Sequence, residues 1–256
     1  MLFKDMVFIG IDPTSGEKSL TYAALDQELN LIALARADIS TVSAFAGGQK
    51  SAFVAVNAPR RVNQGLMNKE SVRNSLSPQP NPGRWTAFRV AEYTLFQKNI
   101  RLPNTPDDLD SCPGWMRTGF TLYQRLEELG YQDFPAENHK QQLLEVYPHA
   151  AYTVLLKKIP FLKKTLVGRL QRQLILHSLS VDVPDPMRIF EEFTRYKILQ
   201  GQLPLEGLFS VEELEALIAA YIAWKAAVEP DEITRVGDPS EGEIVLPGAD
   251  LKSKYY

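Results

Sequence analysis

Three acidic residues stand where a buried carboxylate is expected. Asp12 follows directly after the apolar run 7–11, and Glu145 interrupts another apolar run. Glu215 shares one face of an alanine-rich helical segment with the apolar residue Val211. A carboxylate in such surroundings is costly unless it is hydrogen-bonded or bound to a cation. Because oxygen ligands from distant parts of a chain suit Mg²⁺, the three acids are candidate ligands of a divalent cation.

Each of these acids also has a purely structural explanation. Asp12 would cap a turn, Glu145 would pair with an arginine, and Glu215 would face solvent if the helix had another phase. As a set they predict metal-dependent cleavage of phosphodiester bonds, because divalent cations activate water and stabilise the leaving oxygen. Other chemistries lack their motifs. The three histidines have no metal-ligand spacing, and the sequence has neither a glycine-rich phosphate loop nor a G-x-S-x-G elbow.

The hydrophobic pattern predicts an α/β protein. Apolar runs bounded by turn residues predict strands at 7–12, 19–25, 31–35, 52–57 and 142–147, and an edge strand at 241–247. The first three would form an antiparallel meander. Helical spacing and capping residues predict helices at 38–47, 85–99, 118–129, 163–180 and 210–228, and another beginning at Pro148. We expect one domain over 1–256, with loop and helical insertions at about 60–135 and 160–208.

Basic residues near the acids are candidates for contacting a polyanion. The helix predicted at 163–180 has a leucine face, which we expect to be buried, made of Leu166, Leu170 and Leu174. Its other faces are basic, and solvent exposure is the usual explanation for such charges. In a nuclease, four arginines would contact the phosphates of a bound nucleic acid: Arg60, Arg61, Arg169 and Arg172.

The overall composition narrows the class of protein. The net charge of −3 argues against a surface coated in basic residues, although a local basic groove is compatible with it. A single cysteine, Cys112, excludes an internal disulfide and fits a reducing compartment. The sequence has no signal-peptide pattern and no apolar run near the ~20 residues of a membrane helix. We therefore predict a cytoplasmic protein with no membrane partner, while the oligomeric state stays open.

A series of short motifs runs through nearly the whole chain: Ile9–Asp12, Val54–Pro59, Arg89–Glu92, Trp115–Phe120, Glu145–Pro148, Glu215–Ala220 and Gly242–Pro247. In this order they resemble the motifs of an uncharacterised family of predicted nucleases with a ribonuclease H-like fold. Each motif is weak singly, but their number and order make the resemblance fairly specific.

The resemblance implies a mixed sheet in which an antiparallel three-stranded meander is extended by parallel strands, with flanking and inserted helices. It implies that Asp12, Glu145 and Glu215 are catalytic ligands of Mg²⁺ or Mn²⁺, and that Asn57 assists them. Two positions depart from the family pattern. Asn57 stands where the family often has aspartate, which would weaken a two-metal site, and Glu215 stands where aspartate is usual.

Three functions remain open at this point. The first is a metal-dependent nuclease. The second is a binding protein for nucleic acid or protein on the same fold, with weakened catalysis, for which Asn57 is the main support. The third is a phosphotransferase of the actin and sugar-kinase type, which shares the Gly-Ile-Asp strand opening. The chain is short for the two lobes of that type, and it has no second Asp-x-Gly phosphate loop.

Overall fold

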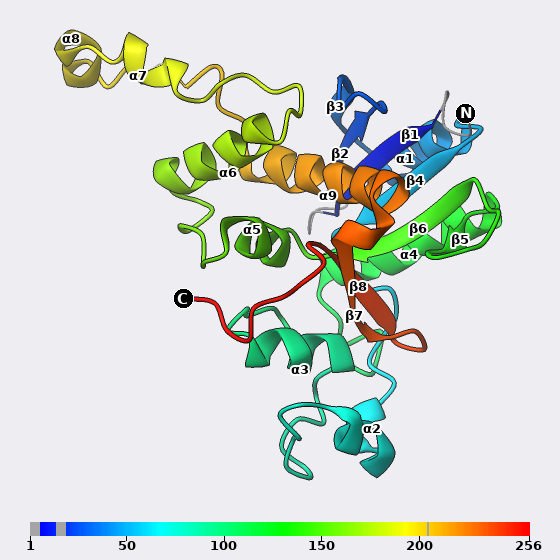
Figure 1. Cartoon of the computed structure of the whole chain (residues 1–256). Coiled ribbons are helices and arrows are strands. Elements are labelled where there is room, and N and C mark those ends of the chain that lie inside the picture. The colour runs from blue at the N-terminus through cyan, green and yellow to red at the C-terminus, as the bar shows by residue number, and fades with distance from the viewer. Residues whose placement is uncertain (1–5, 14–18, 204) are drawn as a thin grey trace.

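One mixed sheet forms the centre of the protein, as a computed structural model that describes residues 6–13, 19–203 and 205–256 shows (Figure 1). Its strands are β1 (Val7–Asp12), β2 (Leu20–Leu25), β3 (Leu31–Ala37), β4 (Ala52–Val56), β5 (Gln132–Asp133), β6 (Gln141–Val146), β7 (Ile233–Asp238) and β8 (Gly242–Pro247). Their order is β3-β2-β1-β4-β6-β8-β7, and β5 pairs with β6. The strands β1 to β3 are antiparallel, whereas β4, β6 and β8 continue the sheet parallel to β1. The predicted mixed α/β sheet is confirmed.

The register brings three strand ends to one edge of the sheet. Ile11 of β1 lies beside Val56 of β4, and Val56 lies beside Glu145 of β6. The amide of Asn57 donates a hydrogen bond to the carbonyl of Ile11 at 2.9 Å. Asp12 and Asn57 are therefore neighbours at the carboxyl edge of adjacent parallel strands, which is where open α/β sheets bind ligands.

Helices lie on both faces of this sheet and beyond its edges. The helices of the described residues are α1 (Ile39–Gly47), α2 (Glu70–Ser75), α3 (Val90–Gln97), α4 (Gly114–Glu128), α5 (Pro148–Leu156), α6 (Leu166–Ser178), α7 (Arg188–Glu192), α8 (Arg195–Leu199) and α9 (Val211–Val228). Side chains of α5, α6 and α9 form one hydrophobic core with the sheet. Side chains of α1 and α4 form a second core with it. The carboxyl edge of β1 and β4 thus lies between two helical layers.

Close packing of α9 against β1 depends on small residues. A methyl group on Gly10 would lie 2.0 Å from the carbonyl oxygen of Ala216 and 2.2 Å from the amide nitrogen of Ala220. Real Cβ atoms do not approach backbone atoms so closely, so glycine at this position allows the helix to lie directly on the strand. The same contact brings the first turns of α9 to the end of β1, and it sets the position of Glu215.

Several boundaries and edges differ from those predicted. The helix expected at 85–99 begins only at Val90, because Arg89 and Glu92 form a capping arrangement that starts it there. The helix expected at 118–129 spans Gly114–Glu128. The strand at 241–247 is not an edge strand, since β8 lies between β6 and the unpredicted strand β7.

The buried face of α6 is also not the predicted leucine face. Leu174 is 38% exposed, whereas Arg172 and Gln173 are buried. Arg172 donates hydrogen bonds to the carbonyls of Phe161 and Gly168, and its guanidinium lies over an aromatic ring of α5. Gln173 bonds to backbone groups of the chain between α6 and α9. Because these polar groups find partners inside the fold, hydrophobic spacing alone predicts the wrong face.

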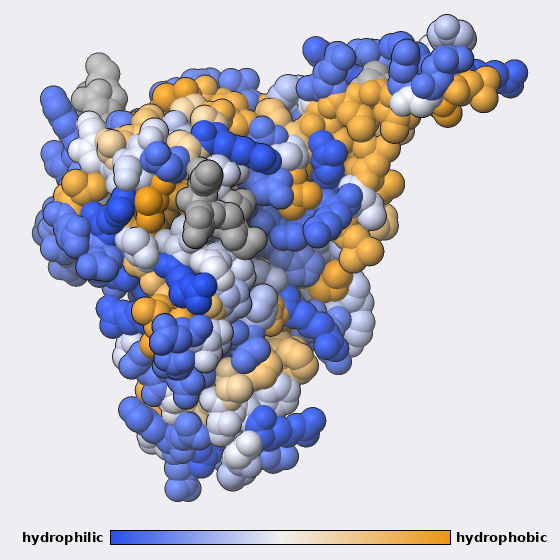
Figure 2. All heavy atoms as spheres, turned by 180° about the vertical axis from the view of Figure 1, so that it is seen from behind, coloured by the Kyte–Doolittle hydropathy of each residue, from blue (hydrophilic) through white to orange (hydrophobic). Residues whose placement is uncertain are grey.

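The short helices α7 and α8 project away from the sheet (Figure 1). Phe190 is 52% exposed, Tyr196 71% and Leu199 77%. Figure 2 shows a band of apolar residues along this projection and the adjoining edge of the body. Across the described ranges, no helix combines the length and apolar character needed to cross a membrane.

Candidate functional site

Asp12, Asn57 and Glu215 form a hydrogen-bonded group at the carboxyl edge of the sheet. The side-chain amide of Asn57 donates to Asp12 Oδ1 at 2.7 Å and to Glu215 Oε2 at 3.4 Å. Asp12 ends β1, Asn57 follows β4, and Glu215 lies near the start of α9. The two acids are each only 6% exposed. Residues from three distant parts of the chain therefore meet as a pair of carboxylates bridged by an amide.

Burial and mutual repulsion make this pair electrostatically unfavourable. Burial raises the pKa of Asp12 from 3.8 to about 7, and the negative charge of Glu215 adds to the increase. The hydrogen bond from Asn57 and the charge of Lys163 act in the opposite direction, lowering that pKa. Lys163 Nζ lies 2.5 Å from Glu215 Oε1, and its side chain is 44% exposed. The negative charge of the pair is thus partly balanced by the Lys163 ammonium, and a second cation would stabilise the pair further.

A pocket of about 630 Å³ opens directly beside these carboxylates. This volume is typical of small-ligand sites, which span roughly 300–1,000 Å³. Besides the three site residues, its lining consists of Pro13, Pro103, Trp115, Tyr147, Lys163, Lys164, Arg169, Ser210, Val211 and Glu212. The pocket therefore combines acidic, basic and aromatic groups.

The structure does not bring Glu145 into this group, which corrects the expectation that three acids would converge. Arg89 donates to both oxygens of the Glu145 carboxylate, at 3.0 and 2.5 Å, and the backbone amide of Arg60 donates at 2.7 Å. Arg89 is 1% exposed and Glu145 5%. A guanidinium buried so deeply needs a carboxylate partner, and Glu145 supplies it. The alternative that Glu145 pairs with an arginine describes the observed contact.

Arg89 is the centre of a larger buried network that sequence reasoning missed. Its Nε donates to Glu92 at 2.9 Å, and its Nη1 donates to the carbonyl of Glu241 at 3.1 Å. Glu92 also accepts hydrogen bonds from the amide and hydroxyl of Thr105. The Glu241 carboxylate accepts from three backbone amides, those of Gln64, Leu66 and Val90. The network ties together the segment after β4, the start of α3, the loop before α4 and the β7–β8 turn. The Arg89–Glu92 spacing was the one sequence signal for it.

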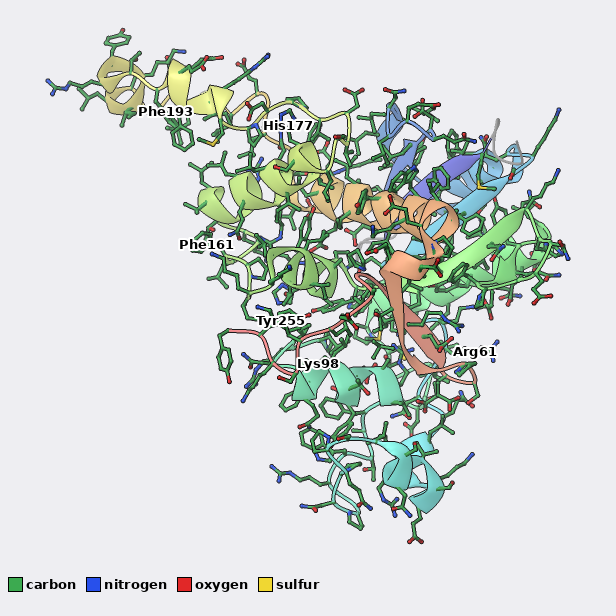
Figure 3. The ribbon with its side chains drawn as sticks, viewed as in Figure 1. Arg61, Lys98, Phe161, His177, Phe193 and Tyr255 are labelled. Carbon is green, nitrogen blue, oxygen red and sulfur yellow. The ribbon has the colours of Figure 1, made fainter. Side chains whose placement is uncertain are left out.

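Two of the four predicted phosphate-binding arginines are paired with acids away from the pocket. Arg60 forms ion pairs with Asp133 at 2.6 Å and with Glu127, and its side chain is 10% exposed. Arg61 lies 3.4 Å from Asp133. Figure 3 shows Arg61 on the side of the molecule that carries the β7–β8 turn. Neither arginine lines the pocket.

The other two arginines belong to α6, and they differ in exposure. Arg172 is 2% exposed and is bound to carbonyl groups, so it is not presented to a ligand. Arg169 lines the pocket, and its Nε and Nη2 donate to the carbonyls of Phe209 and Leu208, each at 2.7 Å. Lys163 and Lys164, which precede α6, line the pocket as well. The cationic side of the site is therefore Arg169 with two lysines.

The predicted metal site changes accordingly. Within residues 6–13, 19–203 and 205–256, no three Asp, Glu, His or Cys side chains are grouped so that they could hold a metal ion. Asp12 and Glu215 remain as a carboxylate pair, with Asn57 between them. A role for these residues in binding Mg²⁺ or Mn²⁺ stays a prediction.

The arrangement so far defines a mixed α/β protein with a carboxylate pair beside a charged pocket. The chain belongs to the family described as "Protein of unknown function (DUF429)", whose family model matches residues 10–241. Membership of an uncharacterised family, which the motifs predicted, is therefore confirmed. No curated protein and no solved structure matched the chain.

Proposed function

We propose that this protein is a metal-dependent nuclease with a ribonuclease H-like fold. The observation that carries the proposal is the meeting of Asp12 and Glu215 around Asn57, beside a pocket with a cationic wall. The strand order supports the fold, since an antiparallel meander leads into parallel strands and α9 packs on the first strand. Carboxylates beside basic groups suit a reaction at a phosphodiester, because the basic groups attract the polyanion.

The carboxylate pair fits a hard divalent cation. Mg²⁺ is usually held by one or two carboxylates together with water molecules, and two carboxylates are what this site offers. The repulsion that raises the pKa of Asp12 would be relieved by a cation, and the Lys163 ammonium already makes such a contact with Glu215. Asp12 and Glu215 would hold the ion, which when bound would polarise the phosphate and supply an activated water.

The remaining pocket residues would bind and orient the substrate. Asn57 holds the Asp12 carboxylate in place by its hydrogen bond. Arg169 is fixed by two backbone carbonyls, so its guanidinium keeps one orientation toward an incoming phosphate. Lys164 is exposed and can follow the phosphate as it enters. The buried Arg89–Glu145 pair supports the loops at the same edge of the sheet and would act on the site only through their positions.

Cleavage assays test this proposal directly. Purified protein is incubated with single-stranded, double-stranded and branched DNA and RNA, with Mg²⁺ or with Mn²⁺. We expect cleavage that is lost in Asp12→Asn and Glu215→Gln and kept in the control Glu128→Gln, an exposed acid on α4. Absence of cleavage of every substrate with both metals contradicts the proposal, as does cleavage that survives both site substitutions.

One observation favours a second candidate, a nucleic-acid-binding protein without catalysis. Lys163 neutralises Glu215, and Asn57 provides an amide where a third acid would strengthen a metal site. Titration calorimetry separates the two candidates. Micromolar binding of Mn²⁺ supports the nuclease, whereas retained nucleic-acid binding with no heat of metal binding supports the binding protein.

A further inference from the structure

The pocket has two chemically different walls, which come from different parts of the fold. Pro103, Trp115 and Tyr147 line it from the loop before α4, from α4 and from the junction of β6 with α5. Lys163 and Lys164 precede α6, Arg169 lies on α6, and Ser210 to Glu212 begin α9. Asp12 and Asn57 lie at the strand ends that both groups of elements border. The aromatic and cationic groups therefore line the same pocket as the carboxylate pair.

The aromatic wall, formed by Trp115 and Tyr147, is held in position by contacts outside the pocket. Trp115 is half-buried and packs against the core formed by the sheet with α1 and α4. The Tyr147 hydroxyl donates to the carbonyl of Arg101 at 3.0 Å, which fixes that ring. An aromatic ring held in this way is a ready surface for a nucleobase, because every base has a flat face that can stack.

The cationic wall, formed by Lys163, Lys164 and Arg169, has positive charge that can bind an anionic ligand. Lys164 makes no hydrogen bond or ion pair with any residue whose structure is described. Arg169 uses only Nε and Nη2 in its bonds to backbone carbonyls, neither of which neutralises its charge. Glu212, the remaining acid of this wall, lies 3.5 Å from Arg36. Among the residues whose structure is described, Lys164 and Arg169 are thus two cationic groups of the pocket without an acidic partner.

We propose that the pocket receives one nucleotide of a single-stranded nucleic acid, with its base against Trp115 and its phosphate at Lys164 and Arg169. This inference rests on the proposed function and specifies its substrate class. A base within a duplex is stacked and paired, so reaching Trp115 would require it to be extruded. A base in a single strand is already free to stack on a side chain. Single strands should therefore bind more tightly than duplexes of the same length.

Binding measured without metal tests this inference. Fluorescence anisotropy in EDTA compares a labelled oligothymidine strand with the same strand annealed to its complement. We expect the single strand to bind more tightly, Trp115→Leu to bind it about tenfold more weakly, and Trp115→Phe to remain within about twofold of the wild type, since phenylalanine keeps the stacking face. Circular dichroism confirms that both variants are folded. Equal affinity of Trp115→Leu and wild type, or equal binding of duplex and single strand, overturns the inference.

A matched pair of lysines tests the phosphate contact. Affinity falls as salt rises, and we expect Lys164→Ala to make the negative slope of log affinity against log salt shallower by about 0.7, the value for one phosphate contact with a single strand. Lys158→Ala removes the same charge from an exposed residue outside the pocket, and we expect it to leave the slope unchanged. An equal change of slope in both variants overturns the inference.

The two proposals can fail separately. Because EDTA removes the metal, this binding does not depend on cleavage. A protein that binds single strands through Trp115 but never cleaves them supports the inference and contradicts the nuclease. A protein that cleaves nucleic acid equally well with and without the Trp115 ring supports the nuclease and overturns the inference.

Discussion

Replacing Asp12 by asparagine should stabilise the protein at high pH and should not do so at low pH. Asparagine keeps an oxygen that can accept the hydrogen bond from Asn57, which spans 2.7 Å in the wild type. It removes the negative charge that burial and Glu215 disfavour. The substitution therefore isolates the electrostatic cost of ionised Asp12 from its hydrogen bond.

The size and sign of the effect follow from the raised pKa. In the folded protein the pKa of Asp12 is about 7, against 3.8 for the free group. Between these values the folded state holds a proton that the unfolded state has lost, so wild-type stability falls as pH rises through this window. At 1.36 kcal/mol per pKa unit, ionised Asp12 costs roughly 4 kcal/mol above pH 7. Relative to the variant, the wild type should lose roughly 3 kcal/mol between about pH 4.5 and about pH 8.

Urea denaturation at several pH values measures the difference in free energy of unfolding between the wild type and Asp12→Asn. Asp110→Asn is the control for loss of an exposed aspartate. Addition of Mn²⁺ then separates a metal ligand from a merely destabilising acid. At a metal concentration of 100 times its Kd, binding should stabilise the wild type by about 2.7 kcal/mol, and it should not stabilise Asp12→Asn. A stability gap that stays constant with pH, or a variant that is less stable than the wild type at high pH, would refute this reasoning.

Four further substitutions test other parts of the structure. Gly10→Ala would push a methyl group to 2.0 Å from the α9 backbone, so we expect urea denaturation to show a loss of about 1–3 kcal/mol in the free energy of unfolding; a loss below about 0.5 kcal/mol would contradict the packing of α9 on β1. Arg89→Met leaves the Glu145 carboxylate buried without its ion-pair partner and should lower the free energy of unfolding by about 3–5 kcal/mol. Glu145→Gln, if folded, should bind Mn²⁺ with the same affinity as the wild type. A tenfold weaker affinity would make Glu145 a metal ligand. Lys163→Met removes the ammonium that contacts Glu215 and should raise Mn²⁺ affinity by about two- to fivefold, as expected for a partly exposed ion pair; calorimetry showing unchanged or weaker binding would exclude competition between Lys163 and the cation.

Local patterns in the sequence predict much of the sheet. The runs that became β1, β2, β3, β4 and β6 are short, apolar and bounded by turn residues, so each signals its strand without help from the rest of the chain. Ser210 and Glu213 form the capping box that starts α9. The short strand β7 was missed because four of its six residues are threonine, arginine, glycine and aspartate, which give no apolar alternation.

Burial of polar residues was harder to predict. Arg172 and Gln173 look like the solvated side of a helix, yet they lie inside because carbonyl groups of the segments before and after α6 accept their hydrogen bonds there. The partner of Glu145 is 56 residues away in the sequence. Such pairings depend on three-dimensional proximity, and residue type alone does not predict them.

The sequence by itself determined that Asp12 ends a buried strand, that Asn57 follows another, and that Glu215 lies on a helix with an alanine-rich face. Tertiary structure alone decided which acids share a site. Gly10 allows α9 to lie against β1, which brings Glu215 to Asn57 and Asp12, while buried Arg89 takes Glu145 as its partner. The physical reason is that a buried charge pairs with whichever opposite charge or hydrogen-bond donor lies within reach, and the packing of distant elements sets the distance between the two groups.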